Sequence, residues 1–283
     1  MAAFINLPAL PDVDGLEEDD IEEEEPQEPP YSPLHAAASQ GNLGAVKALL
    51  QDGGHNINEP DDNDKTPLYL AFENQHSKIA SYLLKNGATS KECCDEDSDL
   101  LHLAVAKGDL KIARMLVELG VDVDGRLCKG DTPLHYAARA GMRRCVKFLV
   151  RKGADLKIRG GELEAYALHE AASSKSVESV EILIGNGAKP DVVDKEEGTP
   201  LHWAAARGSK SIAELLLSRR VDVNCKSSSN STPLHLAVHH GHYSVAETLI
   251  KHGAEVNVCM TMGFSVLHVA VRHGSSEVVS LLL

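Results

Sequence analysis

Aromatic residues are scarce in this chain of 283 residues, which has one Trp, six Tyr and four Phe. Sandwich and barrel cores rely on β-branched and aromatic side chains, so this composition favours closely packed helices of Ala, Leu and Val. No apolar run reaches the roughly 18 residues that a membrane span needs. The first ten residues have no basic residue ahead of an apolar stretch, and Pro8 interrupts them. We therefore expect neither a secretion signal nor a membrane anchor.

Lys and Arg are absent from residues 1–30, which contain 11 acidic residues. The whole chain has a formal net charge of −14, so most of the excess negative charge lies in this segment. Such a composition cannot bury enough apolar surface to offset chain entropy, and it predicts a disordered tail over 1–30. The chain also lacks the clustered cations that bind nucleic acid or an anionic membrane, so neither is expected as a partner.

Motifs of catalysis are also missing from the sequence. There is no G-x-S-x-G elbow, no phosphate-binding loop and no dinucleotide fingerprint, so we expect no enzyme activity and no cofactor. The six cysteines contain no C-x-x-C pair, and free thiols in a reducing compartment are the expected state. This indicates a cytoplasmic or nuclear protein.

What the chain does contain is a repeat, in which a Leu-His dipeptide returns along the whole sequence. The leucines are Leu34, Leu101, Leu134, Leu168, Leu201, Leu234 and Leu267, and Leu68-Tyr69 fills the single gap. Successive leucines are 34, 33, 33, 34, 33, 33 and 33 residues apart. A period this regular indicates a solenoid of stacked units.

The cleanest unit begins at residue 231. Thr232 is suited to an N-cap and Pro233 to the first helical position, where its missing N–H costs nothing. Gly241 is expected to end this short helix, and Gly253 to end a second one in the left-handed conformation. Helices this short are not stable alone, so each unit must bury its flank against the next.

The T-P-L-H pattern and its 33-residue period resemble the ankyrin-repeat family. The resemblance implies an all-α solenoid of helix-turn-helix units with extended turn tips over residues 31–283. The predicted units lie near 31–62, 63–96, 97–129, 130–160, 161–197, 198–230, 231–260 and 261–283. The eighth is incomplete, and we expect the natural protein to continue beyond Leu283.

Some units depart from the pattern. The second has Phe72 where others have Ala or Val, and Gln75 in place of the Gly between helices. In the fifth, Lys175 replaces that Gly, and in the sixth Arg220 replaces the C-terminal Gly. Arg220 is expected to cost about 1 kcal/mol if it keeps the left-handed conformation. Lower local stability is predicted for the second and fifth units.

Seven of the 14 histidines belong to the repeated Leu-His, where the resemblance implies a structural role in bonding to neighbouring turns. His76 and His242 are expected to be structural too. His239, His240 and His273 instead fall at the ends of first helices. A zinc site needs three or four converging ligands, and no third ligand is clearly placed, so no metal is predicted.

In ankyrin repeats, the turn tips and the ends of the first helices usually hold a partner protein. Carried onto this sequence, the candidate partner-binding residues are Lys129, Arg139, Lys195, Arg207, His239, His240, Met262, Phe264, Arg272 and His273. This set suits an acidic segment with an apolar anchor, and the protein itself is expected to be monomeric when complete. The alternative is that these are ordinary solvated surface residues.

Two further hypotheses rest on the family resemblance. Asn224 and Asn257 lie in L-x5-[DE]-V-N segments similar to those that an asparaginyl hydroxylase modifies in ankyrin repeats, although simple turn capping is the alternative. The main functional prediction is a binding scaffold or adaptor. The alternative is the recognition arm of a larger protein, such as a ubiquitin-ligase receptor, kinase or channel, whose effector region follows residue 283.

Overall fold

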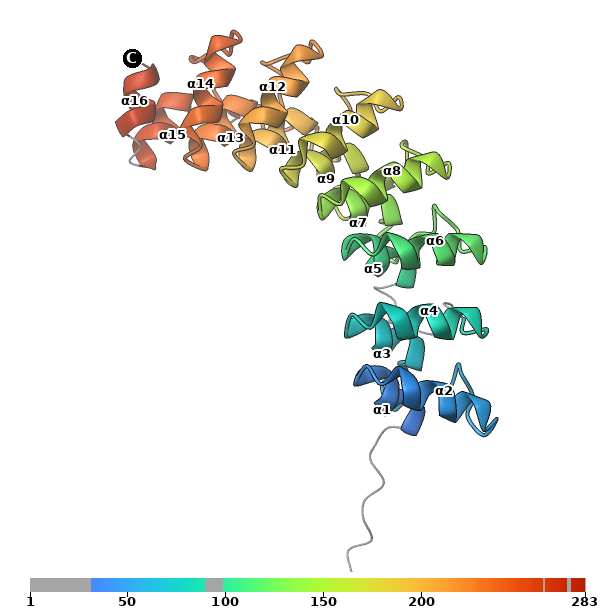
Figure 1. Ribbon diagram of the computed structural model, residues 1–283. Helices are drawn as coiled ribbons and strands as arrows, with labels where there is room; N and C mark the ends of the chain where they lie inside the picture. The colour runs from blue at the N-terminus through green and yellow to red at the C-terminus, as the bar shows by residue number, and fades with distance from the viewer. Residues whose placement is uncertain (1–31, 90–98, 262, 274–275, 283) are drawn as a thin grey trace, which may run out of the picture. The chain divides into compact units, whose positions relative to one another are not determined.

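The computed structural model describes residues 32–89, 99–261, 263–273 and 276–282. The predicted tail over 1–30, the candidate residue Met262, and the cysteines Cys93 and Cys94 lie outside the described residues. Within the described ranges the chain folds into successive pairs of short helices, which confirms the predicted all-α repeat architecture (Figure 1).

Each pair consists of a first helix of seven residues followed by a second helix, which has nine residues in α2 to α14. The first helices are α1 (Pro33–Ser39), α3 (Pro67–Glu73), α5 (Leu100–Ala106), α7 (Pro133–Arg139), α9 (Ala167–Ser173), α11 (Pro200–Ala206), α13 (Pro233–His239) and α15 (Val266–Arg272). The second helices are α2 (Leu43–Gln51), α4 (Ser77–Lys85), α6 (Leu110–Glu118), α8 (Arg143–Arg151), α10 (Val177–Gly185), α12 (Lys210–Ser218), α14 (Tyr243–Lys251) and α16 (Ser276–Leu282).

The ends of the helices follow the local sequence. The Thr232 hydroxyl accepts a hydrogen bond from the backbone N–H of His235, and Pro233 occupies the first position of α13 as predicted. Gly241 has φ 71° and Gly253 has φ 90°, the left-handed conformation that ends each helix. These signals explain why every helix begins and ends at an equivalent place in its unit.

At the helix ends of the described residues, three residues other than glycine keep this left-handed conformation. Gln75 has φ 63°, Lys175 has φ 66° and Arg220 has φ 62°. They occupy the positions where the other units have Gly, so the fold imposes the backbone geometry even where the residue does not favour it.

The core lies between the helices of neighbouring units and is made of Leu, Ala, Val and Ile. First helices pack on first helices and second helices on second helices (Figure 1). Fully buried Ala104, Ala138 and Ala205 lie at these contacts. Because their side chains are a single methyl group, the helices can approach closely, as the alanine-rich sequence predicted.

The junction between the second and third units differs from the rest. Helices α3 and α5 make much weaker contact than the other neighbouring first helices. Phe72, which is buried, occupies the place of a small residue at the end of α3. The Lys107 Nζ atom of the third unit donates to the carbonyl oxygens of Phe72 and Glu73, at 3.3 and 3.0 Å, and lies over the Phe72 ring. A polar bridge thus replaces part of the close helix contact.

A two-stranded hairpin between α8 and α9 was not predicted. Strand β1 (Arg159–Gly160) pairs with β2 (Ala165–Tyr166) in antiparallel register. The spacing from Leu134 to Leu168 is 34 residues rather than 33, and the extra residue falls in this region. Gly160 is required here, because a Cβ atom would lie 2.6 Å from Oδ1 of Asp131.

Candidate functional site

Five of the seven repeated histidines bond to the turn of the next unit. In His135, Nδ1 accepts from the backbone N–H of Thr132 at 3.2 Å, and Nε2 lies 3.0 Å from the carbonyl oxygen of Ala165 in the following turn. The equivalent Nε2 contacts reach the carbonyl oxygens of Lys65, Asp131, Gly198 and Ser231 from His35, His102, His169 and His202. These bonds confirm the structural role that the resemblance implied.

Most of these histidines are held in the neutral form. Burial lowers the pKa of His169 to about 4, and it also lowers the pKa of His102, His135, His202 and His235. Desolvation penalises the charged imidazolium, and in His102, His135, His169 and His202 the Nε2–H donates to a carbonyl oxygen, which sets the tautomer. These histidines therefore have a structural role in the repeat.

His76 and His242 make a second kind of contact between units. The Nε2 atom of His242 lies 3.1 Å from the Ala206 carbonyl oxygen, and that of His76 lies 2.9 Å from the Ser39 carbonyl oxygen. A Cβ on Gly208 would lie 2.6 Å from Nδ1 of His242, so the glycine leaves room for the ring. The predicted structural role of both histidines is confirmed.

Trp203, the only tryptophan of the chain, lines a hollow of about 420 Å³. The hollow, called the Trp203 hollow below, lies between α11, α13 and four turn tips. Its apolar lining includes Leu163, Leu236 and Met260. Four serines, Ser173, Ser227, Ser229 and Ser231, and the side chains of Asp194, Glu196 and Arg207 complete it. An apolar floor with a few polar groups is the usual composition of a binding site.

Asp194 fixes the indole of Trp203 in place. Its Oδ2 accepts from Nε1 of Trp203 at 2.8 Å, and its Oδ1 accepts from the backbone N–H groups of Glu196 and Gly198 at 2.9 and 2.8 Å. One buried carboxylate therefore shapes the turn tip and orients the ring. Ser231 lines the same hollow, and its buried hydroxyl has no hydrogen-bond partner within the described part of the chain.

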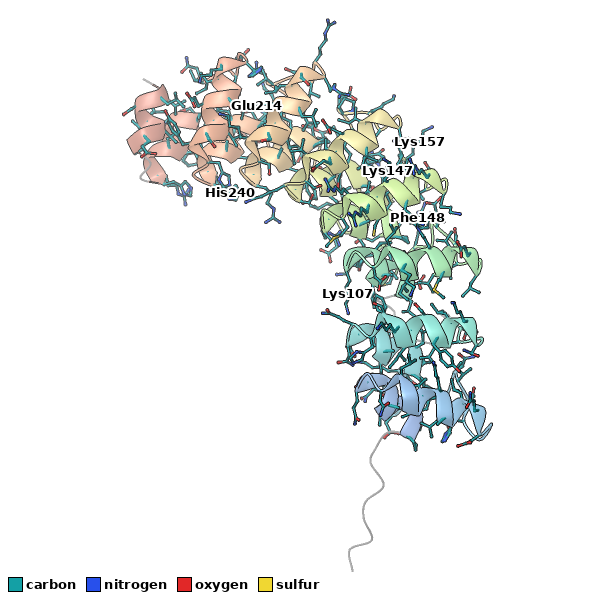
Figure 2. All side chains as sticks on the ribbon, viewed as in Figure 1. Lys107, Lys147, Phe148, Lys157, Glu214 and His240 are labelled. Atoms are coloured by element: carbon teal, nitrogen blue, oxygen red, sulfur yellow. The ribbon has the colours of Figure 1, made fainter. Side chains whose placement is uncertain are left out.

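Three histidines lie at the ends of α13 and α15, and Arg207, which lines the hollow, acts on the charge of one of them, His240. The ring of His239 is 4.9 Å from that of His240 and 4.4 Å from that of His273, both edge to face. We call His239, His240 and His273 the histidine cluster; Figure 2 labels His240. His240 and His273 occupy equivalent positions in adjacent units. Of the three rings, however, those of His239 and His273 lie nearest to each other.

The candidate partner-binding residues fall into two groups. Arg207, His239, His240 and His273 are exposed and lie near one another, since Arg207 and His273 both act on the charge of His240. Lys195, Phe264 and Arg272 are also exposed. The role of all these residues in partner binding stays a prediction, as does that of Met262, which lies outside the described residues.

Arg139 and Lys129 are engaged by carboxylates of the chain itself. Nε and a terminal nitrogen of Arg139 donate to the two carboxylate oxygens of Glu170 at 2.9 and 2.7 Å, and the guanidinium also contacts Asp131 at 3.1 Å. The bonds to Glu170 raise the pKa of Arg139. Lys129 lies 3.1 Å from Glu162. Because carboxylates of the chain already offset their charge, Lys129 and Arg139 attract an acidic partner less than Arg207 does.

Asn224 links two units rather than standing free. Its Oδ1 accepts from the backbone N–H of Glu255 at 2.8 Å, and its Nδ2 donates to the Gly253 carbonyl at 3.2 Å. Asn58 makes the same pair of contacts with Thr89 and Gly87. These bonds favour the turn-capping alternative for Asn224. Hydroxylation of Asn224 and Asn257 stays a prediction, which the intact mass after incubation with such a hydroxylase would test.

Sequence reasoning missed Trp203, Asp194 and the hollow that they form. One signal was available, because a single large indole in the alanine-rich segment Trp203–Ala206 does not fit a purely packing role. Asp194 and Leu163 carried no such signal, since only the fold brings their turn tips to α11.

The described ranges show neither a metal site nor a membrane span. They contain no group of three or more His, Cys, Asp or Glu side chains placed to hold a metal ion. No described helix is both long and apolar enough to cross a bilayer.

Comparison with known proteins gives the family. A model for three ankyrin repeats matches residues 14–93, 89–159 and 168–260, and a single ankyrin-repeat model matches 262–283. The chain therefore belongs to the ankyrin-repeat family, as the sequence pattern predicted. Ankyrin repeats generally mediate protein–protein interaction and are typically non-enzymatic.

Two relatives share part of the chain. Over 59 residues, 20% of this chain, it is 48% identical to the Transient receptor potential cation channel subfamily A member 1 from Homo sapiens. Over 82 residues, 29% of this chain, it is 37% identical to Rabankyrin-5 from Mus musculus. The matches span 5% and 6% of the length of these relatives.

Proposed function

We propose that this chain is a protein-binding scaffold that holds an acidic segment of a partner at the Trp203 hollow and the neighbouring histidine cluster. The observation that carries the proposal is the joining of an apolar hollow to exposed cationic groups, with Arg207 in the lining of the hollow. An aliphatic or aromatic side chain of the partner fills the hollow against Trp203. Acidic residues beside that anchor then lie next to Arg207 and the histidines.

The other candidate residues have graded roles in this proposal. Lys195, Phe264, Arg272 and Met262 extend the surface at its rim. Lys129 and Arg139 contribute less, because Glu162 and Glu170 already offset their charge. The partner is a protein rather than nucleic acid or membrane, and the scaffold works as a monomer in the cytoplasm or nucleus.

A capture experiment with a matched control tests this proposal. The full chain is compared with one variant carrying Arg207→Glu, His240→Glu and Arg272→Glu, and with a second carrying Lys78→Glu, Lys111→Glu and Lys147→Glu on the second helices. All six positions are exposed, so neither variant disturbs the core. We expect partners in a cell lysate to be lost from the first variant only.

A third variant, Trp203→Ala, separates the anchor from the charges. We expect it to weaken binding of the same partners by roughly tenfold or more, because an aromatic floor at the centre of an interface typically contributes over 1 kcal/mol. Identical captures by the wild type and all three variants would place recognition on a surface that these substitutions do not reach, or outside the described residues.

The alternative function is the recognition arm of a larger protein. It is favoured by one observation, that both relatives are far longer than the part that matches this chain. An antibody raised against residues 100–250 and applied to a blot of the source cells decides it. A product much longer than 283 residues supports the alternative, and a product of this length supports the simple scaffold.

A further inference from the structure

The cations at the ends of the first helices differ in what neutralises them. Arg139 at the end of α7 contacts two carboxylates that are each 8% exposed, Asp131 and Glu170. Further along, Arg207 and the histidine cluster form no ion pair with any carboxylate in the described ranges. Arg139 thus has carboxylates of its own chain beside it, whereas Arg207 and the histidine cluster have no carboxylate of the described residues paired with them.

The charged groups around the histidine cluster come from every helix packed beside it. Arg207 caps α11, His242 caps the start of α14, and Arg272 lies beside His273 at the end of α15. The groups whose charge acts on His240 are His239, His242, Arg207 and His273, and each opposes its protonation. These groups and burial lower the pKa of His240, burial being the larger cause.

The acidic side chains that line the Trp203 hollow or lie on α12 and α14 form no ion pair with these histidines. Asp194 and Glu196 line the Trp203 hollow together with Arg207, but Asp194 already binds the Trp203 indole and two backbone amides. Glu247 of α14 pairs with Lys251 at 2.7 Å, and Glu214 of α12 pairs with Lys210 at 3.8 Å. No carboxylate of the described residues forms an ion pair with the histidine cluster, so a carboxylate of a partner can take that place.

Rings this close repel one another when they are protonated together. The distances of 4.4 and 4.9 Å between ring centres mean that each proton added makes the next less favourable. A carboxylate placed beside the rings reverses this effect, because it stabilises the charged form of each imidazole. Binding of such a ligand and uptake of protons are then linked, so each strengthens the other.

We propose that His239, His240 and His273, together with Arg207, form a proton-dependent docking surface for a carboxylate-rich segment of the partner. The inference rests on the proposed function and adds that affinity rises as the pH falls from about 7.6 to about 5.8, the range in which histidines titrate. The cationic groups are spread over the ends of α11, α13 and α15. Such a row suits singly charged acceptors spaced along a peptide rather than one compact anion.

A defined peptide probe tests the inference with the full chain. The probe is a peptide of sequence Glu-Glu-Leu-Phe-Glu-Glu with a tetramethylrhodamine label, which does not titrate in this pH range, and its control replaces the four Glu by Gln. Glu stays ionised at pH 5.8, so any change in affinity reports the protein. We expect the acidic probe to bind about fivefold tighter at pH 5.8 than at pH 7.6 by fluorescence anisotropy, a ratio appropriate to one or two linked protons.

The triple variant His239→Gln, His240→Gln, His273→Gln is expected to lose this ratio. The matched control is His252→Gln, an exposed histidine on the second-helix side, which should leave the ratio unchanged. Circular dichroism at both pH values shows that each variant is folded. Calorimetry in two buffers of different ionisation enthalpy should show net proton uptake by the wild type at pH 6.5, and none by the triple variant.

The outcomes separate the two proposals. Equal affinity for the acidic probe at both pH values, with no proton uptake, overturns the proton-linked surface and leaves the proposed acidic ligand standing. Failure to bind at either pH, or equal binding of the Gln peptide, overturns both. A pH ratio that persists in the triple variant assigns the linkage to other groups and also overturns the inference.

Discussion

At the scale of single residues, the fold imposes one backbone geometry on different side chains. Gln75, Lys175 and Arg220 all have the left-handed φ that glycine has in the equivalent positions. An L side chain crowds the backbone there, whereas glycine does not. The sequence showed which residue replaces glycine at each of these positions. The structure showed that the left-handed conformation is kept at all three.

Replacing these residues by glycine should therefore stabilise the protein. For Arg220→Gly we expect a gain of about 1 kcal/mol in the free energy of unfolding, with similar gains for Gln75→Gly and Lys175→Gly. The matched reverse change is Gly253→Arg, at the position equivalent to Arg220 one unit later, where a Cβ has open space. It should lose a comparable amount. Urea unfolding measures all four, and a loss on Arg220→Gly would show that its side chain makes a compensating contact.

At the scale of helices and units, stability is a sum over neighbouring interfaces, so an atypical unit weakens its own junctions first. The second unit combines Phe72, the strained Gln75 and weak contact between α3 and α5. The fifth unit was predicted to be weak for similar reasons. There, however, the paired strands β1 and β2 and the Arg139–Glu170 ion pair add links that the sequence did not indicate.

Amide exchange should reveal this difference between units. We expect the backbone amides of α3 and α4 to exchange faster than those of α11 to α14, because fewer tertiary contacts oppose local opening of the second unit. The fifth unit was also predicted to be less protected, and its extra links should bring α9 and α10 closer to the level of α11. Mass spectrometry after timed exchange measures each helix. Uniform protection along the units would contradict the prediction for the second.

At the scale of the whole molecule, the buried histidines make stability depend on pH. His102, His135, His169, His202 and His235 have a lowered pKa in the folded chain but titrate near 6.5 when unfolded. The unfolded chain therefore binds more protons as the pH falls below about 7. Stability is complete above that pH and is lost progressively toward pH 4, where His169 protonates in the folded state.

The expected result is a lower urea midpoint at pH 5.5 than at pH 7.5. His169 alone should contribute roughly 1 kcal/mol of this loss. The variant His169→Gln has a side-chain amide in place of the imidazole ring, and this amide does not titrate. The stability of the variant protein should therefore depend less on pH. A midpoint that is constant over this range would mean that the histidines are not buried as neutral groups.

The sequence by itself determined the repeat, its period, the helix boundaries and the family, because these depend on local signals that recur every 33 or 34 residues. It also indicated Arg207 and the histidine cluster, since equivalent positions of stacked units must lie near one another. Only the tertiary structure decided which cations are free and which are paired. It also decided that Asp194, Leu163 and Met260 meet at Trp203, because the turn tips of three units converge there and their side-chain contacts are set by packing between units.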